Sequence, residues 1–416
     1  MNRRVVITGC GAVSPVGSTV DLLWENLQNG KCGIDFIKKF DTTDLKVKIA
    51  GEVQDFEPLD YIKKSDIRKT DMFTQYAIGA AVQAMEDSGV QAHVDPTRLG
   101  VYMGSGIGGI HTFIDECHKM DEKGPSRISP FFIPMMISNI AAGTIAIRYN
   151  AQGPCLPVVT ACATGTNAIG EAYRAIKHGY ADAIISGGTE ASITPLSIAG
   201  FTNLTALTTT NDPTQASIPF DKRRNGFVMG EGAGALILEN LETALKRGAK
   251  VYGEIVGYGH TCDAYHITAP HPEAIGGTRA ISLAMAEAVN AGVHFEESQI
   301  YVNAHGTSTP LNDKSETIAI KNALGDHITR TLVSSTKSMT GHMLGAAGAI
   351  EAIASVMALK DGIIPPTIGY KEADPDCDLD YVPNEKRAVQ SDVALSISLG
   401  FGGHNGCLAF VRYTGE

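Results

Sequence analysis

The chain has 416 residues, of which 44% are hydrophobic, and its formal net charge at pH 7 is −11. This length exceeds what one compact core usually holds, so we expect two domains or two fused halves. The acidic charge argues against a nucleic-acid-binding protein, and no apolar run is long enough to cross a bilayer.

The first part of the chain alternates between predicted strands and helices. A buried strand at Arg4–Thr8 is followed by Gly9-x-Gly11, but Ser14 stands where a dinucleotide-binding fingerprint needs its third glycine. The further elements expected in this part are helices at Leu22–Leu27, Asp71–Ser88 and Ile140–Tyr149, and strands at Leu99–Met103 and Ala183–Gly187. Residues 111–137 are mixed in character and bounded by prolines, so we expect an insertion there.

The stretch from Val158 to Gly170 predicts a short strand, a small-residue turn at Cys162 and a helix. A cysteine at such an elbow lies at the positive end of a helix, which favours the thiolate and hence a nucleophile. The alternative is that Cys162 is a small buried apolar residue, as most free cysteines are.

The second part repeats the order of the first: strand, small-residue turn, helix rich in alanine and isoleucine, strand, glycines. Its expected elements are strands at Ala233–Glu239, Val251–Tyr258, Ile300–Ala304, Leu332–Ser335 and Val393–Ser398, and helices at Thr278–Ala291, Asp313–Leu324 and Ala346–Leu359. We therefore predict an α/β fold of two pseudo-duplicated halves, residues 1–250 and 251–416. The helices that follow the turns carry little charge, so we expect them to be buried on every side, between two sheets.

Four candidate catalytic residues follow predicted strand ends, where α/β folds bind their ligands. They are Cys162, His305, Lys337 and His342. A nucleophilic thiol needs a base or an electrostatic partner, and acyl transfer needs donors for an oxyanion. Each histidine alone is more often structural, but their joint position in glycine-rich turns favours a catalytic site.

The eight cysteines lack the C-x-x-C spacing of zinc sites, and no secretory signal is recognised before them. We expect reduced thiols, no metal and a cytoplasmic location. Lys64, Arg68 and Lys69 form a basic cluster on an otherwise acidic chain. The cluster is either a solvated face or a docking patch for an acidic partner.

Several segments together resemble one family closely. They are TACATG, NAHGTSTPLND, STKSMTGHMLGAAG, GFGGHN, PFDKRRNGFVMGEGAG and DAYHITAP. They are similar to the motifs of elongating β-ketoacyl-acyl-carrier-protein synthases, the condensing enzymes of fatty acid synthesis. The resemblance extends over essentially the whole chain, and the length and the last motif look more like the type II enzyme than its type I relative.

The resemblance implies a thiolase-like fold with αβαβα layers, usually in a homodimer. The reaction it implies joins an acyl group on the enzyme to malonyl-acyl-carrier-protein with loss of CO₂, giving 3-oxoacyl-acyl-carrier-protein. The implied partners are acyl- and malonyl-acyl-carrier-protein, without nucleic acid or membrane. No resident cofactor is implied, because phosphopantetheine arrives on the carrier.

The resemblance also implies roles for individual residues. Cys162 would carry the acyl group, and His305 and His342 would stabilise the enolate. The N–H groups of Cys162 and Phe401 would form the oxyanion hole, with Phe401 also acting as a gate. Lys337 would act electrostatically with Glu351, Asp313 and Glu316.

Further implied residues contact the substrates. Thr307 and Thr309 would touch the phosphopantetheine arm, and Ile107 and Thr268 would lie near the acyl pocket. Carrier proteins in this family's systems are acidic, so the residues implied for docking are Lys64, Arg68, Lys69 and Arg127.

Three positions depart from the family pattern. Ile397 replaces an asparagine associated with a structural monovalent cation near Glu351, so we do not expect a cation of the usual geometry. Leu399 replaces a phenylalanine beside the gate, which changes its packing. Thr205 stands where relatives can carry a carrier-binding arginine, which weakens docking on that side.

Four alternative functions differ from this one in the residues that they need. A polyketide ketosynthase would share every catalytic residue. A degradative thiolase would need a second catalytic cysteine near the last glycine motif, where only Cys407 follows. A non-catalytic chain-length factor would lack Cys162, and a cysteine hydrolase would need a peptide groove that nothing in the sequence indicates.

Overall fold

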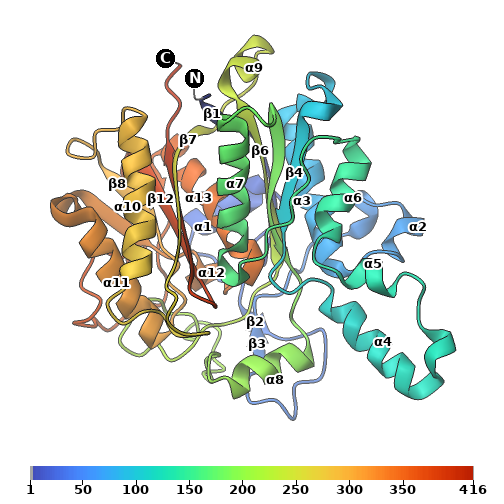
Figure 1. Cartoon of the computed structure of the whole chain (residues 1–416). Coiled ribbons are helices and arrows are strands. Elements are labelled where there is room, and N and C mark those ends of the chain that lie inside the picture. Colours follow the sequence, from blue (N-terminus) through green and yellow to red (C-terminus); the bar gives the residue numbers. More distant parts are fainter. Residues whose placement is uncertain (1–2, 416) are drawn as a thin grey trace.

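Among the residues that the structure describes, nine strands form one mixed sheet made of two halves (Figure 1). The computed structural model describes residues 3–415. The first half-sheet has the order β4 (Leu99–Gly104), β5 (Ala183–Glu190), β6 (Gly232–Asn240) and β1 (Val5–Val13). The second has the order β7 (Gly253–Cys262), β13 (His404–Val411), β12 (Val393–Gly400), β8 (Ile300–Asn303) and β9 (Thr331–Ser334).

The two half-sheets meet where β1 pairs with β7. Only Val5–Ile7 and Gly253–Ile255 take part in this antiparallel contact. Beyond it, helices α7 (Thr164–Lys177) and α13 (Ala347–Asp361) lie between the two half-sheets (Figure 1).

Further helices cover the outer faces and complete the layers. Helices α3 (Met72–Ser88) and α6 (Ile140–Tyr149) cover the first half-sheet. Helices α10 (Ile275–Asn290) and α11 (Pro310–Leu324) cover the second. The predicted αβαβα layering is thereby confirmed.

The two central helices were expected to be buried on every side. This prediction is confirmed for the predicted span of α13 and only in part for α7. Every residue of Ala347–Leu359 is buried, whereas α7 leaves Glu171, Arg174 and Lys177 partly exposed on one flank. The two helices approach through glycines. A Cβ on Gly348 would lie 2.1 Å from the Thr166 hydroxyl oxygen, so no larger residue fits without a shift.

The strand predicted before Cys162 is wrong. The segment runs beside β4 with a single bridge, between Val101 and Cys155. Pro154 and Pro157 lack N–H donors, so a regular ladder cannot form. The segment ends in the 3₁₀ turn η5 (Ala161–Ala163), which continues into α7.

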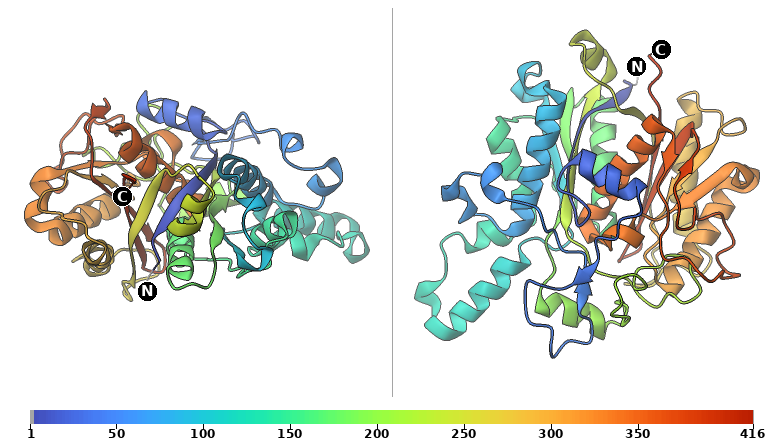
Figure 2. Two further views of the ribbon diagram at one scale, coloured as in Figure 1. Left: turned by 90° about the horizontal axis from the view of Figure 1, so that it is seen from above. Right: turned by 180° about the vertical axis from the view of Figure 1, so that it is seen from behind.

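Residues 111–137 form a helical projection. It contains α4 (Ile110–Lys123) and α5 (Phe132–Met136) and extends from the body of the molecule (Figure 2). In α4 only Thr112 and Glu116 are buried, which agrees with the expectation of an insertion outside the core.

Smaller elements connect these layers. They are helices α1 (Val20–Gln28), α2 (Lys64–Ile67), α8 (Pro195–Asn203), α9 (Leu241–Lys246) and α12 (Lys337–Thr340), and the two-residue strands β2 (Asp35–Phe36), β3 (Ile49–Ala50), β10 (Ile363–Ile364) and β11 (Arg387–Ala388). Within residues 3–415, no helix combines the length and the apolar character needed to cross a bilayer. Both ends of the described chain lie near α9, opposite α8 (Figure 1).

Candidate active site

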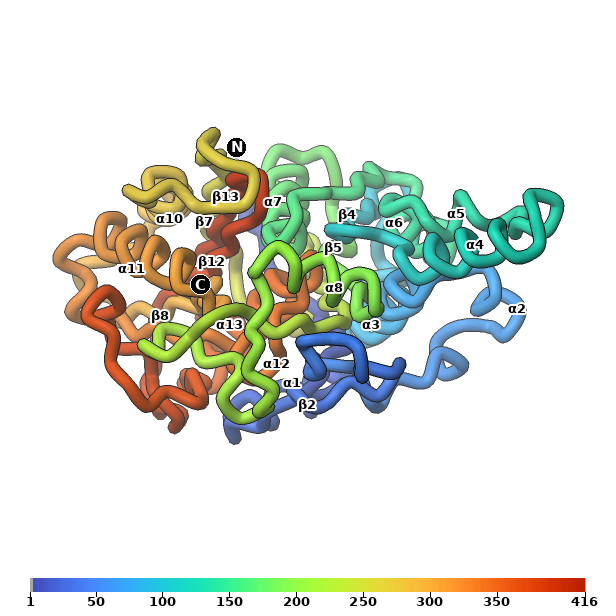
Figure 3. Tube along the Cα trace, turned by 90° about the horizontal axis from the view of Figure 1, so that it is seen from below, coloured from blue at the N-terminus to red at the C-terminus, as the bar shows by residue number. Residues whose placement is uncertain are grey.

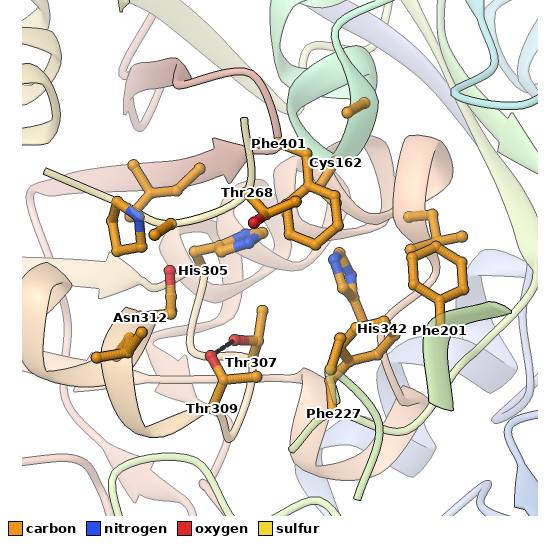
Figure 4. Close-up of a pocket in the computed structure, with 18 of the residues that line it drawn as sticks. Cys162, Phe201, Phe227, Thr268, His305, Thr307, Thr309, Asn312, His342 and Phe401 are labelled. Atoms are coloured by element: carbon orange, nitrogen blue, oxygen red, sulfur yellow. Dashed lines mark hydrogen bonds between the residues drawn. The ribbon is translucent and has the colours of Figure 1, made fainter. Parts of the chain in front are cut away.

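A cavity of about 470 Å³ opens at the end of the molecule where α8 lies. Seen from below, α8 lies near the middle of this face, between elements of the two halves (Figure 3). Both halves line the cavity. The first contributes Ile107, Cys162, Glu190, Phe201 and Phe227, and the second contributes Thr268, His305, Thr307, Thr309, Asn312, His342 and Phe401 (Figure 4).

Cys162 lies in the turn η5 and is only 9% exposed. Ala161 before it has a φ of 50°, in the left-handed region that a residue with a Cβ rarely adopts. Such strain is typical of functional sites, and Thr164 stabilises the turn because its hydroxyl accepts the Thr160 N–H at 2.9 Å.

Burial raises the pKa of the Cys162 thiol to about 12. Lys337 and the backbone N–H groups of Phe401 and of Cys162 itself oppose this rise in pKa. Burial therefore outweighs the helix-end effect expected from the sequence, and the resting group is a neutral thiol. The two N–H groups implied for the oxyanion hole both face its sulfur.

His305 and His342 lie with their rings almost perpendicular, 5.2 Å apart between centroids. The backbone N–H of His305 donates to Glu316 Oε1 at 2.6 Å, and that of His342 donates to the Val228 carbonyl at 2.7 Å. The Phe227 ring packs edge-on against His342 at 5.2 Å. These contacts fix both rings at the cavity wall.

Both imidazoles are neutral. Burial, and then the charge of Lys337, lowers the pKa of His305 and of His342 well below 6.5. The Nδ1 atom of each ring is buried without a hydrogen-bond partner among the described residues. The Nε2 edges are therefore the ones left to meet a substrate.

Of the residues implied to act with Lys337, Glu351 pairs with it directly and Glu316 feels its charge, whereas Asp313 has another partner. Lys337 forms a buried ion pair with Glu351, and burial raises the pKa of the Glu351 carboxyl while Lys337 opposes the rise. Asp313 instead faces Arg224 at 3.4 Å and accepts the Thr307 N–H at 3.1 Å. Asp313 therefore positions Thr307 and is not paired with Lys337.

Glu316 is held beneath His305 by backbone donors. It accepts the N–H groups of His305 at 2.6 Å and Gly306 at 2.7 Å. Burial raises the pKa of Glu316 to about 8, against the effect of the Gly306 donor.

The residues implied for substrate contact also line the cavity. The hydroxyls of Thr307 and Thr309 lie 2.9 Å apart, and Thr268 lies across the cavity from them (Figure 4). Ile107 is 41% exposed at the wall. The Phe401 ring lies 6.5 Å from that of Phe201, between centroids.

The four basic residues implied for docking are exposed and do not line this cavity. The Lys69 Nζ atom lies 5.6 Å from the centroid of the Phe131 ring. This contact joins the segment after α2 to the segment before α5. Arg127 lies between α4 and α5. These cations therefore belong to the projecting side of the molecule.

The sequence did not single out Glu190, Phe201, Phe227 and Asn312, which line the cavity, or Arg224, which pairs with Asp313. Glu190 carried a signal, because it is a charged residue at the end of an otherwise uncharged buried strand. The others reach the site through long-range packing that no local pattern indicates.

Cys407 lies outside the site. It is fully buried in the apolar core of the second half, in β13. It does not line the cavity, so it cannot serve as the second catalytic cysteine of a thiolase.

Comparisons with known proteins agree with this geometry. The family model "Beta-ketoacyl synthase, N-terminal domain" matches residues 2–244, and "Beta-ketoacyl synthase, C-terminal domain" matches residues 252–371. The chain is 53% identical to the 3-oxoacyl-[acyl-carrier-protein] synthase 2 of Synechocystis sp., over 99% of this chain and 98% of that protein. It is 52% identical to the Staphylococcus aureus (strain COL) protein of the same name, over 99% of both chains.

Solved structures show the same fold. A β-ketoacyl synthase from Burkholderia phymatum superposes with a TM-score of 0.90 at 34% identity, covering 99% of this chain and all of that one. A ketosynthase of a type II polyketide synthase, solved with its acyl-carrier protein and bound to a hexaketide, has the same TM-score, identity and coverage.

Proposed function

The chain belongs to the β-ketoacyl synthase family, and from that premise we propose that it elongates acyl chains on acyl carrier protein by decarboxylative condensation. The products are 3-oxoacyl-acyl-carrier-protein and CO₂. One observation carries the proposal: a buried thiol, two donors facing its sulfur and two neutral imidazoles meet in one cavity.

The first step moves the acyl group to Cys162. The sulfur attacks the thioester carbonyl of acyl-acyl-carrier-protein, and the N–H groups of Cys162 and Phe401 bind the oxyanion. The bond to the carrier sulfur breaks, and the carrier thiol leaves with the proton that Cys162 loses. A neutral His305 or His342 can pass that proton through Nε2 in the tautomer whose hydrogen is on Nδ1, whereas the second step uses the tautomer with the hydrogen on Nε2.

The second step uses the histidines as donors. The Nε2–H groups of His305 and His342 donate to the malonyl thioester carbonyl and stabilise the enolate that forms as CO₂ leaves. The enolate carbon attacks the Cys162 thioester, forming the carbon–carbon bond and releasing the Cys162 thiolate. A proton from solvent then returns to the sulfur, as the pKa of about 12 favours, and restores the resting thiol.

No resident cofactor enters this proposal, because the reaction transfers neither a hydride nor a phosphoryl group. The phosphopantetheine arm of the carrier lies along Thr307 and Thr309. Ile397 is buried in the apolar core of the second half, where its side chain offers no oxygen ligand, so the proposal includes no structural cation.

We also propose a homodimer and a cytoplasmic location. Leu156 and Val159 are 44% and 50% exposed on the irregular segment beside β4, which supports contact with a second copy. Light scattering tests the dimer, and cell fractionation tests the location.

The activity test combines the purified protein with acyl- and malonyl-acyl-carrier-protein. We expect CO₂ and a 3-oxoacyl product two carbons longer, and neither from Cys162→Ala. Absence of both with every primer length contradicts the proposal. A single elongation in excess malonyl-carrier indicates fatty acid synthesis, whereas repeated elongation without reduction indicates a polyketide ketosynthase.

A further inference from the structure

Glu190 is a fully buried carboxylate at the cavity wall that the reaction steps above do not use. It ends strand β5, in the half that carries Cys162. Burial raises the pKa of its carboxyl, and the hydrogen bonds that it accepts oppose that rise.

Five donors surround this carboxylate, and they come from three loops. Oε2 accepts the N–H of Gly106 at 2.9 Å and the N–H of Gly345 at 3.0 Å. Oε1 accepts the Ser105 hydroxyl at 2.9 Å, the Ile107 N–H at 3.2 Å and the Ser192 hydroxyl at 3.3 Å. Every partner donates a hydrogen bond, so the site suits an ionised carboxylate, which only accepts. In a glutamine at this position the side-chain NH₂ group, itself a donor, would face some of these donors.

Two glycines let the loops come this close. A Cβ on Gly106 or on Gly345 would lie 2.8 Å from Glu190 Oε2. A Cβ on Gly345 would also lie 2.6 Å from the Gly106 nitrogen. The loop after β4 and the loop after His342 therefore meet at this one carboxylate.

Both loops reach the reacting groups. The first carries Ile107 into the cavity, and the second carries Leu344 into it, two residues after His342. Leu344 has a φ of 47°, a left-handed conformation that needs support from its surroundings.

We infer that Glu190 is a positioning residue, which fixes the acyl-pocket wall at Ile107 and the loop of His342 in one arrangement relative to Cys162. One carboxylate then sets both the fit of the acyl chain and the alignment of the imidazole. This inference rests on the proposed function, and its test includes a measurement that does not.

The test replaces the carboxylate with an amide in Glu190→Gln. We expect kcat for condensation to fall about ten- to a hundredfold, with a smaller change in carrier KM, because the imidazole and the thioester lose alignment. The rates with primers of different length should become more similar, since the loop that carries Ile107 is no longer fixed by the carboxylate. Alkylation of Cys162 by iodoacetamide should become faster at fixed pH, because the charge of Glu190 raises the pKa of that thiol.

Glu52→Gln is the matched control. Glu52 is also buried, at 3% exposure, and accepts two backbone N–H groups, from Lys38 at 3.0 Å and Lys39 at 3.2 Å, but it does not line the cavity. We expect this variant to keep the primer profile and the alkylation rate of the unmodified protein.

A Glu190→Gln protein with an unchanged primer profile and an unchanged alkylation rate overturns the inference. If that variant does not fold, Ser105→Ala removes a single donor from Oε1 and keeps the charge of Glu190, so the primer profile alone decides: it should flatten, and an unchanged profile overturns the inference. If the unmodified protein shows no condensation, the proposed function fails, whereas the alkylation rate still tests the position of Glu190 beside Cys162.

Discussion

Burial sets the chemistry of individual residues in this cavity. Burial disfavours the charged form of each group. It therefore raises the pKa of the Cys162 thiol and lowers the pKa of both imidazoles, and all three groups stay neutral. The thiol and a neutral imidazole are thus the reactive pair, because the resting protein holds almost no thiolate.

This pairing predicts a flat pH dependence. Free imidazole is half-protonated at about pH 6.5, but a lowered histidine pKa keeps the neutral form at more acidic pH. Acylation of Cys162 by a small acyl thioester should therefore keep its rate from about pH 7.5 to about pH 5.5. Stopped-flow kinetics, with circular dichroism at each pH as the check on folding, measures this rate. A tenfold fall per pH unit would instead mean that free thiolate is the attacking species.

At the scale of elements, the contact between α7 and α13 depends on the lack of a side chain at Gly348. A Cβ there would lie 2.1 Å from the Thr166 hydroxyl oxygen and 2.6 Å from the Thr166 nitrogen. Gly348→Ala should lower the free energy of unfolding by about 1–3 kcal/mol through overpacking. Denaturant unfolding measures the change. An unchanged free energy of unfolding would contradict this prediction, because the two helices would then move apart without a loss of stability.

Gly143→Ala is the control for that substitution. Gly143 lies inside α6, its φ is not in the left-handed region, and nothing lies within 4 Å of a Cβ built there. We expect this variant to be more stable by about 0.5–1 kcal/mol, because alanine favours the helix.

Elements with strong periodicity were predictable, and so were the site residues in glycine-rich turns. Helix α6 has the bounds expected from the sequence, and Cys162, His305 and His342 meet as predicted. The prediction of a strand before Cys162 was wrong because two prolines override the β-branched pattern of that segment. The sequence does not indicate that Asp313 pairs with Arg224, because Arg224 is distant in sequence and comes near only through the fold.

At the scale of the whole molecule, charge is unevenly distributed. The chain carries −11 overall, yet Lys64, Arg68 and Lys69 lie together and exposed near α2. A patch of this kind attracts an acidic partner at long range and loses its effect in salt.

Reversing the charge of this patch should weaken carrier binding alone. In Lys64→Glu/Arg68→Glu/Lys69→Glu we expect KM for acyl-carrier-protein to rise about tenfold at low salt, with turnover of small thioesters unchanged. Steady-state kinetics with both substrates measures the difference. Lys246→Glu is the control, since Lys246 is exposed on α9, at the end of the molecule opposite α8 and the cavity. Equal KM values for the triple variant and the control would remove the patch from the docking surface.

The position of the acyl group tests the account most directly. The protein is incubated with acyl-acyl-carrier-protein without malonyl-carrier, digested and analysed by mass spectrometry. We predict one acyl adduct, on the peptide that contains Cys162, absent from Cys162→Ala and discharged when malonyl-acyl-carrier-protein is added. An adduct on an exposed thiol such as Cys155 or Cys262, or one that persists in Cys162→Ala, would contradict the assignment of Cys162 as the acyl-accepting nucleophile.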